Sequence, residues 1–328
     1  MSKIFVNATT RMVVLCIMAA VFGRAAYAQN YPLKPIRFIV ATAPGGLLDV
    51  AARLAGEYFE RAFGQRVLLE NRGGAGGNVG GEAVAKAAPD GYTIGVFHQG
   101  MLVINPFLYK ELPFDPLNDF APVAALTSSP VVVAISGKLP VNNLQEFIAL
   151  AKRDQGRINY GTAGQGSIPH LAGVLFAQAA GIRLTQVHYK GAGPALTDLL
   201  GGQVQAIFVG LGVVRGHIAT GAVKALAVSQ DKRLDSAPNI PTAREAGLPG
   251  FELVTWFGLF APKGTPGAVV AALVKQVQAM QEDPTVLKRL TEGGLDALKE
   301  APEQLGTRMR REYEQFRGIV KAAGIEPE

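Results

Sequence analysis

The sequence of 328 residues contains a single cysteine, Cys16, which lies in an apolar segment near the N-terminus. If that segment is removed, disulfides cannot stabilise the remaining chain, so a large hydrophobic core has to do so. Charged residues are also few, at 18%, against 48% apolar residues. This balance excludes a disordered polyampholyte and predicts a globular protein of one to three domains.

Long hydrophobic runs are absent, since no apolar run approaches the ~20 residues that span a bilayer. The longest run, residues 12–22, follows Lys3 and Arg11 and precedes an A-x-A sequence that ends at Ala28. A basic segment, a short apolar segment and small residues at a cleavage site are typical of an export signal. We therefore expect residues 1–28 to be a cleaved signal peptide and the exported chain to be soluble and periplasmic.

A strong excess of one sign of charge is also missing. The chain has 32 Lys and Arg against 26 Asp and Glu, and Lys3, Arg11 and Arg24 lie in the signal segment, which leaves 29 minus 26, or +3. There is no run of five basic residues and no basic stripe interleaved with aromatic residues. The composition therefore argues against a nucleic-acid partner.

Sequence motifs of common enzymes are incomplete or absent. The G-x-G sequences at residues 74–76, 191–193 and 210–212 lack the third glycine of a dinucleotide fingerprint. Ser167 is not part of a G-x-S-x-G sequence, and no H-E-x-x-H is present. The four histidines, His98, His170, His188 and His217, are scattered without spaced carboxylate or cysteine partners. We expect neither an enzyme nor a metal or cofactor site.

Apolar, strand-like segments alternate with amphipathic segments of helical period in two series, a pattern that predicts an α/β fold with parallel-rich sheets. Four prolines in residues 106–122 predict an irregular connection between the two series. Strands are expected at residues 36–41, 67–70, 92–97, 131–136, 158–161, 186–189, 204–209, 224–229 and 256–261. Helices are expected from residue 51 to 58, and at 78–88, 144–151, 167–180, 192–200, 266–282, 284–292 and 302–322.

Two glycine-rich loops, residues 42–49 and 161–170, each join a strand to a helix. In open α/β sheets ligands bind beyond the carboxyl ends of strands, where glycines let backbone N–H groups approach an anion. Neither loop contains Lys or Arg, and the same glycines would also serve as simple tight turns. A third glycine-rich segment, residues 70–81, resembles a phosphate loop, but the adjacent Glu70 favours a packing role.

Several motifs together resemble the Bug family of periplasmic solute receptors, which serve tripartite tricarboxylate transporters. The motifs are Y-P-L-K-P-I-R at 31–37, P-G-G-x-x-D at 44–49, E-N-R-x-G-A-G-G-N at 70–78, A-P-D-G-Y at 88–92, Y-K-G at 189–191 and A-G-L-P-G at 246–250. The resemblance covers residues 31–328. It implies a type II periplasmic binding-protein fold with two lobes and a crossover hinge. Residues 29–128 and 254–328 would form lobe one, and residues 129–253 lobe two.

The resemblance also implies a ligand carboxylate held between the two loops by backbone N–H groups and ordered waters. Asp49 is expected to brace the N–H groups of its own loop, and a structural role for His170 is as plausible as a cleft role. The implied ligand-binding residues are Ala43, Pro44, Gly45, Gly46, Leu47, Asp49, His98, Gln99, Gly161, Thr162, Ala163, Gly166, Ser167, His170 and Val209.

Apolar residues beside these loops suggest a ligand with an apolar body. Leu47, Leu48, Met101, Val209 and Leu211 follow strand ends, which favours an aromatic or short aliphatic carboxylate over citrate or an amino acid. The alternative is that these side chains pack beneath the loops. The chain is then expected to be a monomeric receptor that delivers a small carboxylate to a membrane permease. The alternatives are a ligand-binding partner of a signalling system and an exported enzyme.

Overall fold

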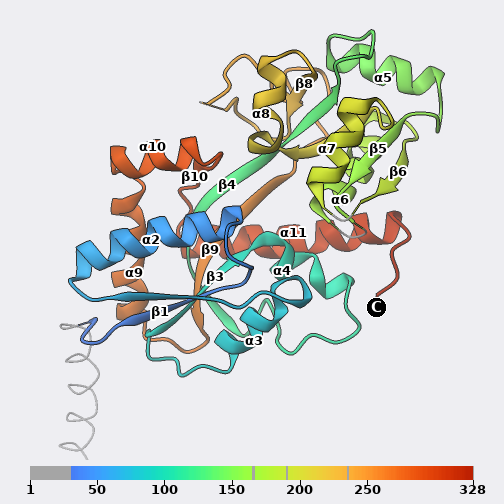
Figure 1. The fold of residues 1–328 in the computed structure, drawn as a ribbon. Coiled ribbons are helices and arrows are strands. Elements are labelled where there is room, and N and C mark those ends of the chain that lie inside the picture. The colour runs from blue at the N-terminus through green and yellow to red at the C-terminus, as the bar shows by residue number, and fades with distance from the viewer. Residues whose placement is uncertain (1–30, 165–166, 190, 235, 328) are drawn as a thin grey trace, which may run out of the picture.

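A computed structural model describes residues 31–164, 167–189, 191–234 and 236–327, so the expected signal peptide lies outside the described residues. The fold is α/β, with two lobes joined by two long strands (Figure 1). Its strands follow the order β2-β1-β3-β9-β4-β7-β5-β6, with β8 and β10 also paired to β4. The expected α/β architecture with two lobes and a crossover is thus confirmed.

Lobe one is built on three parallel strands, β1, β2 and β3, with β9 antiparallel to β3. The apolar sequence of β1 is almost fully buried, and α2 covers it with Ala51, Leu54 and Ala55, the stripe that the helical period predicts. The elements are β1 (Ile36–Val40), α2 (Leu47–Phe63), β2 (Val67–Asn71), α3 (Asn78–Ala85), β3 (Thr93–His98), α4 (Gln99–Val103), β9 (Val254–Pro262), α9 (Gly267–Met280), α10 (Pro284–Glu292), β10 (Asp296–Ala297) and α11 (Pro302–Ala322).

Lobe two has a second parallel core, in which β5 pairs with β6 and β7. Helices α6 and α7 contact this core through different apolar clusters, Phe176 with Phe208 in one and Leu199 with Ile207 in the other. The elements are α5 (Leu144–Arg153), β5 (Asn159–Thr162), α6 (Ile168–Ala180), β6 (Thr185–His188), α7 (Ala192–Gly201), β7 (Ala206–Gly210), α8 (Leu211–Ala219) and β8 (Val223–Val228).

The crossover strand β4 (Phe120–Ser136) runs through both lobes. Residues 120–130 pair with β9, and residues 131–136 pair with β7 and β8, all antiparallel. The sheet is therefore mixed, with parallel strands at the centre of each lobe and antiparallel strands at the crossover. The sequence predicts a strand only from residue 131, because prolines inside a run argue against a strand. The pairing register shifts beside Pro122, which accommodates that proline.

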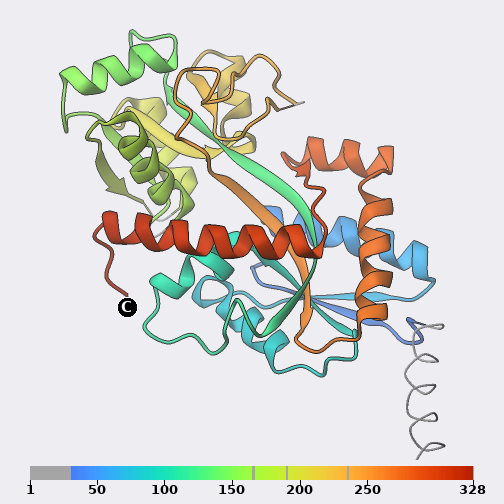
Figure 2. The ribbon, with the colours of Figure 1, turned by 180° about the vertical axis from the view of Figure 1, so that it is seen from behind.

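Helix α11 lies behind both lobes (Figure 2) and contacts β4 and α4 as well as α6 of lobe two. It begins at Pro302 and ends at Ala322, the bounds that the sequence predicts. Two short helices, α4 and α8, were not expected from the sequence. Among the described helices, none has the length and apolar character needed to cross a lipid bilayer.

Candidate functional site

The first glycine-rich loop follows β1 and leads into α2. Gly45 has a φ of +89°, a conformation that favours glycine. Gly46 is the N-cap of α2, with φ −82° and ψ 170°, and no side chain caps the helix. Residues 43–47 are all exposed. The uncapped start of α2 therefore adjoins an exposed loop, from which an anion can approach the first N–H groups of the helix.

Asp49 holds this loop together from below. Its carboxylate is 2% exposed and accepts hydrogen bonds from the Gly45 N–H, Arg53 Nε and Asn71 Nδ2, each at 2.9 Å. Burial raises the pKa of Asp49, but the three hydrogen bonds together outweigh burial and hold the pKa below its ordinary value. The carboxylate is thus ionised and directed at its own loop, as expected for a brace.

The glycine-rich segment after β2 packs directly against the end of β1. A Cβ atom at Gly73 would lie 2.9 Å from the Ala43 nitrogen, and one at Gly80 would lie 2.9 Å from the Ala41 Cα. The side chain of Asn71 also donates to the Thr42 carbonyl at 3.2 Å. The packing interpretation of this segment is confirmed, and the segment supports the first loop from behind.

The second loop follows β5 and leads into α6, and Gly166 of this loop lies outside the described residues. Ser167 is the N-cap of α6, and its hydroxyl accepts from the His170 N–H and donates to the Gly164 carbonyl. The Thr162 hydroxyl accepts from the Gly164 N–H at 3.2 Å and lies 2.8 Å from His188 Nδ1. Both hydroxyls therefore order the loop itself.

Two more expected residues of the second loop, Gly161 and Ala163, differ in exposure. Gly161 is buried in β5, where a Cβ atom would lie 3.1 Å from Ala195, whereas Ala163 is half-buried.

His170 is a buried residue of the first turn of α6, 1% exposed. Its ring lies edge-on to that of His188, with 4.9 Å between ring centroids. Burial, assisted by the nearby His188, lowers the pKa of His170 to about 4. His170 is thus neutral near pH 7 and packs beneath the second loop, so it offers no positive charge to a ligand.

His98 ends β3 and Gln99 begins α4, and the side chains of both form hydrogen bonds inside the protein. His98 Nδ1 accepts from the Met101 N–H at 3.2 Å as the N-cap of α4, and burial lowers the pKa of His98 to about 4. Gln99 is 1% exposed and donates to Glu312 of α11 at 2.8 Å. Glu312 also accepts from the indole N–H of Trp256 at 2.7 Å. The Gln99 side chain therefore belongs to a buried network behind the crossover strands.

The expectation that five apolar side chains border the cleft is wrong for four of them. Leu48, Met101, Val209 and Leu211 are at most 5% exposed and belong to the two hydrophobic clusters. They pack inward because they lie on the core-facing sides of α2, α4, β7 and α8. Among the five, Leu47 alone is exposed, at 38%. The side chain of Val209 is accordingly unavailable to a ligand.

A contact between the lobes that the sequence did not predict lies beside the first loop. Gly294, after α10, approaches Gly212 at the start of α8, where an added Cβ would lie 3.6 Å from the Gly212 Cα. The neighbouring Gly293 lies against Val50 of α2. The start of α8 thus meets lobe one close to α2. In the sequence, only the glycines themselves mark this contact, and they do not recur at a regular spacing that would predict it.

Burial of His170 predicts a pH-dependent stability. Because the folded protein holds the His170 pKa near 4, the unfolded chain binds more protons below about pH 6.5, so stability falls as the pH falls. We expect a loss of about 2 kcal/mol from this residue between about pH 7.5 and pH 5. Urea unfolding of the parent and of His170→Gln at the two pH values measures it.

A matched variant, His217→Gln, removes a histidine from α8 and should keep the full pH dependence. An equally steep fall in His170→Gln would show that the titration of His170 does not contribute.

Comparison with known proteins gives a consistent result. The model of the "Tripartite tricarboxylate transporter family receptor" family matches residues 51–325. Protein BugT of Bordetella pertussis is 33% identical over 321 residues, which cover 97% of this chain and 98% of BugT.

Two solved structures were determined with a ligand. Rpa4515 of R. palustris, with adipate, has a TM-score of 0.77 at 31% identity and covers 91% of this chain and 100% of its own. MatC of Rhodopseudomonas palustris, with bound malate, has a TM-score of 0.72 at 34% identity and covers 88% of this chain and 100% of its own.

Proposed function

Because the chain belongs to the family of tripartite tricarboxylate transporter receptors, we propose that it captures a small carboxylate between its lobes in the periplasm and delivers it to the permease of such a transporter. The observation that carries the proposal is the exposed first loop, in which uncapped N–H groups at the start of α2 are held in place by the buried Asp49. An ionised carboxylate is the chemical partner that such a site favours.

Backbone groups alone supply enough free energy for useful affinity. A hydrogen bond to a charged group contributes roughly 1.5 to 3 kcal/mol, so three or four of them, less the cost of ordering, reach the ~8 kcal/mol of a micromolar complex. The second loop, with its internally bonded Thr162 and Ser167, would offer further N–H groups from lobe two. Closure of the lobes about β4 and β9 would bring the two loops together around the ligand.

A small dicarboxylate is the ligand class that we favour. Two of the similar solved structures contain adipate and malate, both dicarboxylates. Leu47 is the one exposed apolar side chain among the five beside the loops, so they offer no apolar surface that would favour an aromatic ligand. A dicarboxylate places one charge at each end, which suits one glycine-rich loop from each lobe.

A ligand held between two lobes also requires that each part of the chain belong to one lobe. We assign residues 29–128 and 254–328 to lobe one and residues 129–253 to lobe two, with the boundaries where β4 and β9 pair across Ser128 and Trp256. The receptor would act as a monomer, without a cofactor and without catalysis. Each receptor would then bind one ligand at a time.

Thermal unfolding in the presence of a panel of acids tests the ligand class. A ligand at about 100 times its Kd stabilises the folded state by ~2.7 kcal/mol, so a dicarboxylate such as adipate or malate should raise the unfolding temperature clearly. Adipamide, which has the same carbon chain without charge, is the matched control and should have no effect. A protein that responds to no carboxylate, or equally to adipamide, would contradict the proposal.

Export predicts the first residue of the mature protein. If residues 1–28 are a signal peptide cleaved after the A-x-A sequence, the secreted chain begins at Gln29. N-terminal analysis of protein recovered from the periplasm measures this. A periplasmic chain that retains residues 1–28 would show that the segment is not removed.

A further inference from the structure

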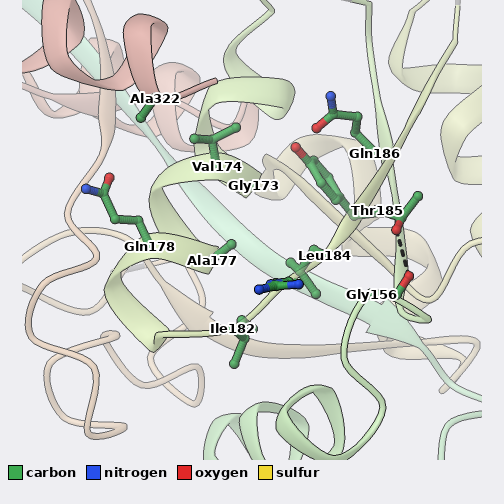
Figure 3. A pocket seen from close by; sticks show the side chains of 12 residues that line it. Gly156, Gly173, Val174, Ala177, Gln178, Ile182, Leu184, Thr185, Gln186 and Ala322 are labelled. Carbon is green, nitrogen blue, oxygen red and sulfur yellow. Dashed lines mark hydrogen bonds between the residues drawn. The ribbon is translucent and has the colours of Figure 1, made fainter. Parts of the chain in front are cut away.

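A groove on lobe two lies apart from the residues assigned to the ligand loops. It has a volume of about 540 Å³ and lies between the edge strand β6, helix α6 and the C-terminal end of α11 (Figure 3). Much of its lining is apolar, from Val174 and Ala177 of α6, Ile182 and Leu184 before β6, and Ala322 of α11. The groove is therefore suited to an apolar side chain supplied from outside.

The strand beside this groove has an unpaired edge among the described strands. β6 is the last strand of the sheet and pairs only with β5, on one side. The N–H groups of Thr185 and Tyr189 donate to the Ile158 and Thr162 carbonyls of the β5 chain. Because backbone groups alternate along a strand, those of Gln186 and His188 point away from β5. Both residues are exposed.

The register shows which face of β6 borders the groove. Gln186 is level with Tyr160, whose ring lies on the α6 face of the sheet, whereas Val187 packs with the cluster on the α7 face. Leu184, two residues before Gln186, lies on the α6 face as well. Alternate side chains of a strand added beside β6 would thus point into the groove next to α6.

The lining of the groove carries positive charge. Arg183 is the only charged residue in its lining, and no Asp or Glu lines it. The Gly156 N–H donates to the Arg183 carbonyl at 3.3 Å, which brings Arg157 close to Arg183 at the start of the two strands. Over the described ranges, Arg183 has no acidic partner within ion-pair distance, whereas Arg157 lies near Asp154, which already pairs with Arg153. A partner with negative charge would therefore complement this surface.

We propose that β6 docks an extended acidic segment of another protein, which adds to the sheet as a further strand and seats an apolar side chain in the groove. Main-chain hydrogen bonds to Gln186 and His188 would give affinity, and the groove and Arg183 would select the side chains. This proposal does not depend on which ligand the glycine-rich loops bind.

A labelled peptide tests the proposal. The probe is acetyl-Glu-Val-Glu-Val-Glu-Val-Glu-amide, and its binding is followed by fluorescence anisotropy. Gln186→Pro removes one of the two N–H groups that face outward, that of Gln186, and leaves every bond to β5 intact, so binding should weaken roughly tenfold. Gln186→Ala keeps that N–H and should bind within about twofold of the parent. Both variants lose the same side chain, so the comparison isolates the backbone donor.

Two further peptides test the role of charge and of the main-chain hydrogen bonds. A peptide with Lys in place of Glu should bind at least about tenfold more weakly, and Arg183→Glu should reduce that difference. A peptide N-methylated on alternate residues, which cannot donate to the edge, should lose binding even if Gln186→Pro does not fold. Equal binding of Gln186→Pro and Gln186→Ala, or of the methylated and parent peptides, would overturn the proposal.

Discussion

Gly46→Val is expected to weaken carboxylate binding at least about 100-fold while the protein remains folded. The valine side chain would cover the N–H groups at the start of α2 and remove one or two charge-assisted hydrogen bonds, each of about 1.5 to 3 kcal/mol. The fold should tolerate the change because Gly46 has φ −82° and a Cβ atom there would meet only the Thr42 hydroxyl, at 3.9 Å. Isothermal titration with the acid found in the thermal panel measures the loss.

The matched control for this experiment is Gly267→Val. Gly267 is the first residue of α9, also in lobe one, and a Cβ atom there has no neighbour within 4 Å. This variant makes the same chemical change at a helix start and should bind as the parent does. Undiminished affinity in Gly46→Val would show that the first loop is not the anion site.

Glu312→Ala is expected to lower the free energy of unfolding by about 3 to 5 kcal/mol. Glu312 is 5% exposed and accepts from Gln99, from the Trp256 indole and from Arg308 Nη1 at 3.0 Å. Its removal leaves these donors buried without an acceptor, although Arg308 keeps its bonds to Glu300. Urea unfolding, followed by circular dichroism, measures the shift of the midpoint.

Two variants on the same helix calibrate this result. Glu314→Ala breaks only an exposed ion pair with Arg317 and should cost less than about 1 kcal/mol. Glu312→Gln keeps one acceptor for Gln99 and Trp256 but presents its amide to Arg308, so an intermediate loss is expected. If Glu312→Ala were as stable as Glu314→Ala, the buried network would not contribute to stability.

The sequence predicted most regular elements because their signals are local. Prolines at the first helical position fixed the starts of α10 and α11, and the apolar period of α2 matched its buried face. The length of β4 was missed because Pro122 and Pro130 argue against a strand, while the pairing with β9 that overrides them is nonlocal. Helix α8 carries Leu211, Val214 and Ile218 at helical spacing, but two glycines within its nine residues argue against a helix in the sequence alone.

The sequence predicted the roles of site residues that depend on their neighbours in the chain. It did not predict side-chain directions that depend on how helices pack on the sheet. An acidic residue in the first turn after a glycine loop predicts a brace, and Asp49 fills that role. The directions of Leu48 and Leu211 depend on how their helices dock on the sheets, which the sequence of a loop does not encode. The same is true of Gln99, whose partner Glu312 is 213 residues away.

The single tryptophan of the chain gives the crossover an optical property. Trp256 lies on β9 opposite Ser128 of β4, is fully buried, and donates its indole N–H to a carboxylate. Its fluorescence therefore comes from one known place, the strand pair that joins the lobes. Any change in emission intensity or wavelength on adding a ligand would report the surroundings of this strand pair, without a label and without interference from a second indole.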